Sequence, residues 1–119
     1  MHKDDEIEIN EFTHFVHMST SDPHIILKSG LRPKSIHNRL YFFGFKTEAE
    51  YKSFIEESIF DTDQNPEYEE GRFYYFELTI PKNYKIYHDP EYMGETENQT
   101  PLYMYYGLQK EMIKYIGSE

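Results

Sequence analysis

The sequence predicts a single α+β domain, residues 1–119, built on a mostly antiparallel sheet with two short helices in its N-terminal half. Residues 11–19 alternate apolar with polar residues, as a strand of a half-buried sheet does, and several other short segments are strand-like and rich in Tyr, Phe and Ile. Two early segments carry helix start and stop signals instead. Strands and helices that do not alternate regularly favour an α+β architecture over a parallel α/β one.

The strand pattern recurs along the whole chain after a polar lead-in. Residues 1–10 are expected to be loose, so the ordered fold is expected over residues 12–117. Polar stretches at 61–71 and 89–101 are expected to be loops. The predicted strands cover residues 11–19, 39–45, 72–80, 84–88, 102–107 and 110–116.

The first helix is predicted over residues 21–30. Ser21 or Asp22 supplies the N-cap, because a short side-chain oxygen can accept a hydrogen bond from a free backbone N–H of the first turn. Pro23 stands near the first helical position, where its missing N–H costs nothing. Gly30 ends the helix.

The second helix is predicted over residues 46–60. Thr47 and Glu50 have the spacing of a capping box, in which each residue satisfies a free backbone donor near the helix start. Apolar residues then recur at helical spacing and give the helix an inner face. This face is formed by Ala49, Phe54 or Ile55, and Ile59.

The composition limits the classes of function. Twelve Tyr and nine Phe supply apolar area for a core, and the absence of Cys excludes disulfides and thiolate metal sites. A net charge of −10, from 22 acidic and 12 basic residues, disfavours a nucleic-acid-binding protein and fits a basic protein partner or simple solubility. No signal peptide begins the chain, and no apolar run reaches the ~20 residues of a membrane span. A cytoplasmic location without membrane contact is therefore expected.

The sequence predicts no metal site. The stretch at 61–72 begins like a calcium-binding loop, but Pro66 stands where that loop needs Gly and Arg72 where it needs Glu. His14 and His17 are three residues apart on a strand and so point to opposite faces.

Three separated motifs carry polar side chains suited to chemistry. His17 and Ser19 share one face of the first strand and are followed by "IILKSGLRP". Tyr41 lies in the strand segment "LYFF", and Tyr51 lies in the second helix. Gln109 and Glu111 are two residues apart at the start of the last predicted strand, so they are expected to share one face.

Together these motifs resemble the ADP-ribosyltransferase family, in particular its His-Tyr-Glu branch, which includes diphtheria-toxin-like and poly-ADP-ribose-polymerase-like enzymes. The resemblance covers most of residues 12–117 and implies a compact ADP-ribosyltransferase-like fold. It implies that His17 and Ser19 anchor NAD, and that Tyr41 and Tyr51 hold the nicotinamide ring between them. The spacing of the two tyrosines is one residue shorter than is usual in the family, which leaves Phe45 as an alternative.

The same resemblance implies the chemistry. Breaking the bond between nicotinamide and ribose generates an oxocarbenium-like cation, which a carboxylate stabilises. Glu111 is the implied catalytic carboxylate, with Glu77 or Glu95 as alternatives, and Gln109 would face the acceptor. His14 is the alternative to His17. NAD is then a substrate, no metal is needed, and the acceptor is a macromolecule, either protein or nucleic acid, as for a toxin or phage effector.

Two other functions remain open. An acidic, Tyr-rich surface suits a non-catalytic protein that mimics nucleic acid and binds a basic partner. Related folds also transfer a 2'-phosphate from RNA to NAD. That reaction needs cations to hold the phosphate, and the chain has only three Arg residues, Arg32, Arg39 and Arg72.

Overall fold

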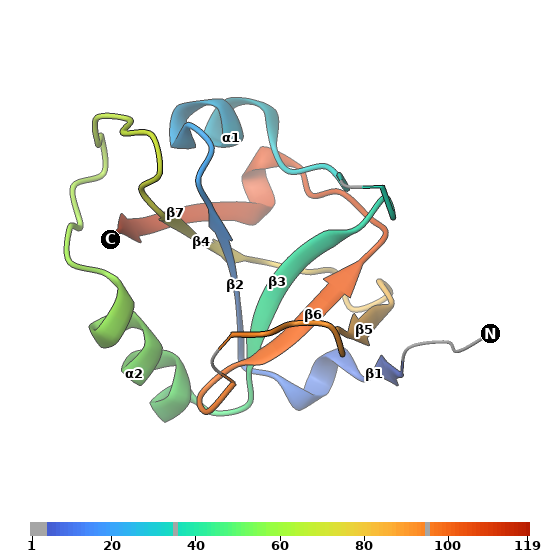
Figure 1. The fold of residues 1–119 in the computed structure, drawn as a ribbon. Coiled ribbons are helices and arrows are strands. Elements are labelled where there is room, and N and C mark those ends of the chain that lie inside the picture. The colour runs from blue at the N-terminus through green and yellow to red at the C-terminus, as the bar shows by residue number, and fades with distance from the viewer. Residues whose placement is uncertain (1–4, 35, 95) are drawn as a thin grey trace.

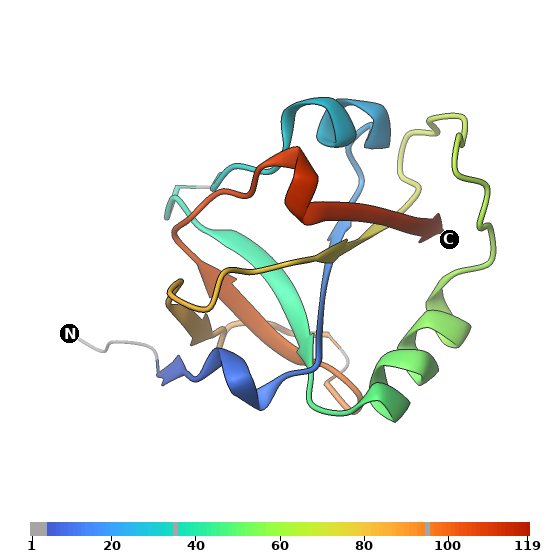
Figure 2. The same ribbon diagram turned by 180° about the vertical axis from the view of Figure 1, so that it is seen from behind.

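The computed structural model describes residues 5–34, 36–94 and 96–119, which form one antiparallel sheet with two α-helices (Figures 1 and 2). The helices are α1 (Pro23–Ser29) and α2 (Glu48–Ser58), with 3-10 turns η1 (Ile9–Glu11) and η2 (Lys110–Met112). The strands are β1 (Glu6–Ile7), β2 (His14–Ser19), β3 (Leu40–Phe45), β4 (Tyr74–Leu78), β5 (Ile86–His88), β6 (Thr100–Met104) and β7 (Ile113–Ser118). The predicted general class, α+β with a mostly antiparallel sheet and two early helices, is confirmed.

The seven strands lie in the order β1-β5-β6-β3-β2-β4-β7, so β2 and β3 are central. These two strands pair only over His14–Val16 and Phe43–Phe45. Beyond that point β2 stays paired with β4 as far as Ser19, and β3 stays paired with β6 as far as Leu40. The two halves of the sheet therefore part at one end, and Figure 1 shows β2 and β3 diverging toward α1.

Alternating side chains of the central strands form two cores, one on each face of the sheet. Phe15 and Phe42 belong to the core that also contains Ile26 of α1. Val16 and Phe43 belong to the core that Phe54 of α2 covers. Each helix thus closes one face of the sheet.

Both helices have the caps that the sequence predicts. The carboxylate of Asp22 accepts the His24 N–H at 3.0 Å, and Gly30 ends α1 with φ +80°. The hydroxyl oxygen of Thr47 accepts the Glu50 N–H at 3.1 Å. On α2 the predicted inner face is narrower than expected, because Phe54 is buried and Ala49 is exposed.

Two expectations about the ends of the fold are wrong. The predicted strand 110–116 begins as η2, and β7 starts only at Ile113. Within the predicted loose lead-in, β1 pairs with β5 and η1 follows it, whereas residues 1–4 lie outside the described residues. No helix in the described part of the chain is long and apolar enough to cross a bilayer.

Candidate functional site

A cleft of about 750 Å³ opens where β2 and β3 part. Its floor is formed by residues from the ends of these strands, including His17, Ser19 and Tyr41. Its wall is formed by α1 and the segment that follows it, residues 30–34. The sheet is split here, so the cleft reaches strand ends that a continuous sheet would bury.

His17 bridges the split between the two halves of the sheet. Its Nδ1 lies 2.7 Å from the backbone carbonyl oxygen of Tyr41. A carbonyl oxygen only accepts, so Nδ1 carries the proton and Nε2 of the neutral ring is an acceptor. Burial lowers the pKa of His17, which outweighs the raising effect of this hydrogen bond, and the charge of Lys34 lowers the pKa further. His17 therefore gives the cleft a neutral acceptor near pH 7.

Hydroxyl groups line the cleft beside His17. The Ser19 Oγ accepts the backbone N–H of Ser21 at 3.0 Å, which orients the hydroxyl while leaving its proton available to a ligand. Tyr41 is 37 % exposed and also lines the cleft, and its ring contacts that of Tyr103 with centroids 6.2 Å apart. Thr20, Ser21 and Ser29 also contribute to the lining.

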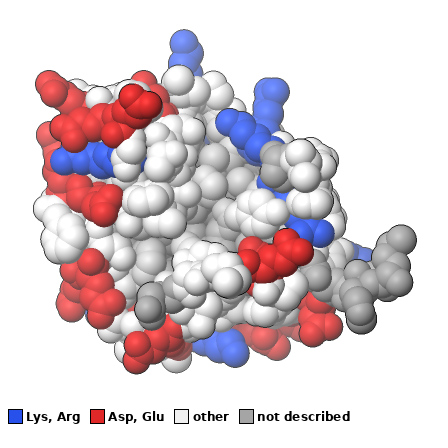
Figure 3. Space-filling model, in the orientation of Figure 1, with Lys and Arg blue, Asp and Glu red and all other residues white. Residues whose placement is uncertain are grey.

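Basic side chains set the electrostatic character of the cleft. Arg32, Lys34 and Arg39 line it, and none of the described lining residues is Asp or Glu. The guanidinium of Arg39 lies 4.0 Å from the ring centroid of Tyr103. Figure 3 shows basic side chains beside the central hollow and one acidic group below it, whereas most other acidic side chains of this face lie along its left and lower borders. In a chain of net charge −10, this cleft favours an anionic ligand.

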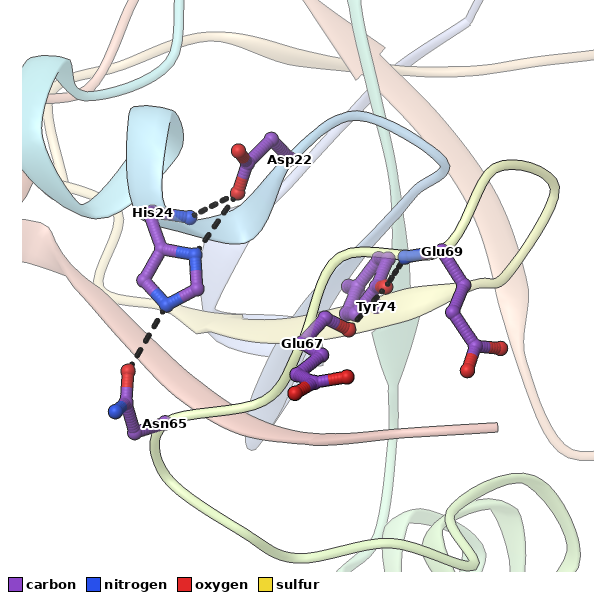
Figure 4. Close-up of polar contacts among 6 residues, drawn as sticks. All are labelled: Asp22, His24, Asn65, Glu67, Glu69 and Tyr74. Carbon is purple, nitrogen blue, oxygen red and sulfur yellow. Dashed lines mark hydrogen bonds and ion pairs between the residues drawn. The ribbon is translucent and has the colours of Figure 1, made fainter.

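The wall formed by α1 is tied to the loop at 61–71 (Figure 4). His24 Nδ1 lies 3.0 Å from the Asp22 carboxylate, and His24 Nε2 lies 3.0 Å from the side-chain oxygen of Asn65. These two hydrogen bonds raise the pKa of His24, with the bond to Asn65 as the larger cause. The start of α1 is therefore held from two sides.

No family model matches the chain, and no curated protein or solved structure is significantly similar to it.

The structure brings three of the predicted site residues together in one cleft, namely His17, Ser19 and Tyr41. Tyr51 does not join them. Its ring stacks on His14 with centroids 3.9 Å apart and meets Phe45 edge-on, at the end of β2 and β3 where the strands are still paired.

Glu111 and Gln109 also do not line the cleft. Glu111 is exposed within η2, and Gln109 is exposed just before it, so the two residues do not share a strand face as predicted. Among the alternatives, Glu77 lies with its carboxylate 3.8 Å from His14 Nε2. Glu95 lies outside the described residues.

Sequence reasoning missed the clustering of Arg32, Lys34 and Arg39. The signal was present in "LRPKSIHNR", which contains three cations within eight residues. The backbones of Lys34 and Arg39 pair through two hydrogen bonds of 3.1 and 2.9 Å, which turn this segment back on itself. This turn places the backbones of Lys34 and Arg39 next to each other at the cleft. Among the described residues, no group of three or more His, Asp or Glu side chains could hold a metal ion.

Proposed function

We propose that the chain is an NAD-dependent ADP-ribosyltransferase and that the split between β2 and β3 is its NAD site. The observation that carries the proposal is a cleft with three cations and no described carboxylate in a strongly acidic protein. NAD has an anionic diphosphate, which Arg32 and Lys34 could bind by charge-assisted hydrogen bonds. A volume of about 750 Å³ lies within the range of small-molecule sites.

The neutral groups in the cleft suit the rest of the molecule. The Nε2 atom of His17 can accept a hydrogen bond from a ribose hydroxyl, and the Ser19 hydroxyl can donate one. The Tyr41 ring offers a stacking surface for nicotinamide. The order of elements also supports an ADP-ribosyltransferase-like fold, since a strand with His-x-Ser precedes a short helix, a strand with Tyr and a second helix.

In the proposed reaction the bond between nicotinamide and C1' of the ribose breaks, and a nucleophile of a macromolecular acceptor forms the new bond to C1'. The bond electrons leave with nicotinamide, and positive charge develops on the ribose. The resemblance assigns the stabilising carboxylate to Glu111, which does not line the cleft and lies on a turn that packs against α1, the wall of the cleft.

Binding of NAD tests the cleft, and its cations are the residues to change. Wild type should show a higher melting temperature with NAD, because a ligand at a hundredfold excess over its dissociation constant stabilises the folded state by about 2.7 kcal/mol. The double variant Arg32→Gln/Lys34→Gln should bind NAD about tenfold more weakly, since it loses two charge-assisted contacts.

The matched control is Lys52→Gln/Lys82→Gln, which removes the same charge from two exposed lysines that do not line the cleft. Equal NAD affinity in the two double variants would show that any loss of affinity comes from the change in net charge and not from the cations at the cleft. Release of nicotinamide in the presence of candidate acceptors measures turnover, and Glu111→Gln should reduce it without changing NAD affinity. No binding of NAD by wild type would overturn the proposal and favour the acidic interaction protein.

The same cations favour a second candidate, transfer of a 2'-phosphate from RNA to NAD. The sequence contains only three Arg residues, but two of them and a Lys lie at the cleft. The positive charges of these three side chains could bind a 2'-phosphate group on an RNA acceptor. Nicotinamide release that requires a 2'-phosphorylated oligonucleotide, and fails with the unphosphorylated one, would favour this reaction.

A further inference from the structure

A second, smaller cavity adjoins the cleft and shares two lining residues with it, Met18 and Tyr41. Its volume is about 180 Å³. The remaining lining comes from β3, from the start of β6 and from the segment after β5, which contributes Asp89 and Tyr92. The two cavities are thus neighbours that share Met18 and Tyr41 in their lining.

The character of the small cavity is opposite to that of the cleft. Its described lining is mainly aromatic and aliphatic, and Asp89 is its single charged residue. Tyr41 is one aromatic contributor, and the rings of Phe43 and Tyr92 meet edge-on with centroids 5.2 Å apart. Aromatic surfaces combined with one carboxylate attract a flat organic cation.

Asp89 is held in place by its own backbone surroundings. Its Oδ1 accepts the backbone N–H of Glu91 at 3.0 Å, and its backbone N–H donates to the carbonyl oxygen of Pro101 at 2.9 Å. The second carboxylate oxygen has no hydrogen bond to another described residue. Asp89 is half-buried and lines this cavity as well as a neighbouring one of about 490 Å³, and its second carboxylate oxygen can accept a hydrogen bond from a ligand.

The two cavities together match one kind of molecule, with an anionic middle and a small flat cation at one end. NAD has this distribution of charge, because its oxidised nicotinamide ring is a pyridinium cation. A cavity of about 180 Å³ has room for one such ring and little more. We propose that Asp89 is a specificity-determining residue that selects the positively charged ring of oxidised NAD. This inference rests on the proposed function, since it requires the diphosphate to occupy the cleft.

Asp89 then distinguishes ligands that differ only in the charge of this ring. NADH has the same diphosphate and riboses, but its dihydronicotinamide ring is neutral. Wild type should bind NAD about tenfold more tightly than NADH, which corresponds to one partly desolvated contact between a cation and its site. ADP-ribose, which lacks the ring, reports on the cleft alone.

The test is calorimetric titration of wild type and Asp89→Asn with NAD, NADH and ADP-ribose. Asparagine keeps the Oδ1 that accepts the Glu91 N–H, so the variant should retain the fold. The matched control is Asp63→Asn, because Asp63 Oδ1 accepts the Asn65 N–H at 3.0 Å in the same local geometry, away from both cavities.

The proposal expects Asp89→Asn to bring the affinities for NAD and NADH within about twofold of each other, with ADP-ribose unchanged. Asp63→Asn should keep the wild-type preference. Equal binding of NAD and NADH by wild type, or an unchanged preference in Asp89→Asn, would overturn the role of Asp89 while leaving the cleft as the dinucleotide site. An equal loss of affinity for NAD, NADH and ADP-ribose in Asp89→Asn would also overturn the role of Asp89. No binding of any of the three by wild type would overturn the proposed function itself.

Discussion

The rings of His14 and Tyr51 stack face to face, with centroids 3.9 Å apart and planes 5° from parallel. Glu77 completes the contact, because its carboxylate lies 3.8 Å from His14 Nε2 and also contacts the Tyr51 hydroxyl. The three residues come from β2, α2 and β4 and join α2 to the sheet. Tyr51 thus stabilises the fold at the end of the sheet away from the parting of β2 and β3.

This contact predicts a stability change at alkaline pH. Burial, with the nearby Glu77 charge, raises the pKa of Tyr51 to about 12 from its ordinary value near 10. The unfolded chain therefore loses the Tyr51 proton first, and the stability that this residue contributes falls as the pH rises from about 10 to 12. Urea unfolding of Tyr51→Phe should show a shallower decline than wild type over this range. Tyr68→Phe, at an exposed tyrosine, is the control, and identical slopes for wild type and Tyr51→Phe would contradict the assignment.

Gly30 is expected to tolerate no side chain. Its φ is +80°, and a Cβ added there would collide with the carbonyl oxygen of Leu108. The substitution Gly30→Ala should lower the free energy of unfolding by about 1–3 kcal/mol, because strain and collision add. Gly71→Ala is the matched control, since Gly71 has φ +86° but no atom within 4 Å of the added Cβ. Chemical denaturation should therefore show a smaller loss for Gly71→Ala, and equal losses would show that the contact with Leu108 contributes nothing.

Tyr74 is expected to order the loop at 61–71 (Figure 4). Its ring is fully buried, and its hydroxyl accepts the Glu69 N–H at 2.7 Å and donates to the Glu67 carbonyl at 3.1 Å. Tyr74→Phe removes both bonds and should cost about 1–3 kcal/mol of unfolding free energy. Limited proteolysis within the loop should become faster at the same time. Tyr68→Phe should alter neither quantity, and unchanged cleavage in Tyr74→Phe would disprove the anchoring role.

Local signals allowed the two helices to be predicted from the sequence. The 3-10 turn η2 before the last strand could not be predicted in this way. The caps at Asp22 and Thr47 act within a few residues, so their effect does not depend on the rest of the fold. The segment at 110–116 contains Met112, Ile113, Tyr115 and Ile116, which favour a strand, but its first two residues are the polar Lys110 and Glu111. Its first turn is fixed instead by tertiary packing, because Leu108 pairs with Leu31 and Gly30 lies against the backbone of Lys110.

The candidate site also depends on tertiary packing that no local sequence pattern reveals. The sequence placed His17 and Tyr41 on two strands, and the structure has them on β2 and β3 with His17 Nδ1 2.7 Å from the Tyr41 carbonyl oxygen. The family resemblance, rather than a local pattern, associates the two residues. The sequence could not show that β2 and β3 part after Val16, with Tyr41 at the cleft there and Tyr51 against Phe45 at the end where the strands stay paired. Asp89 follows a strand of only three residues, and no local pattern connects it with the cavity beside Tyr41.

The pKa shifts of His17 and His24 should change the stability of the fold in opposite directions as the pH falls below neutral. Burial lowers the pKa of His17, so below about pH 6.5 the unfolded chain binds a proton that the folded chain does not. The stability that neutral His17 contributes is therefore lost as the pH falls below that value. His17→Asn should make the decline in unfolding free energy between pH 7 and 5 shallower. The pKa of His24 is raised, so His24→Gln should make the same decline steeper. Parallel curves for wild type and His17→Asn would show that His17 titrates normally, and the neutral acceptor that the cleft offers to a ribose hydroxyl would then be protonated in part near neutral pH.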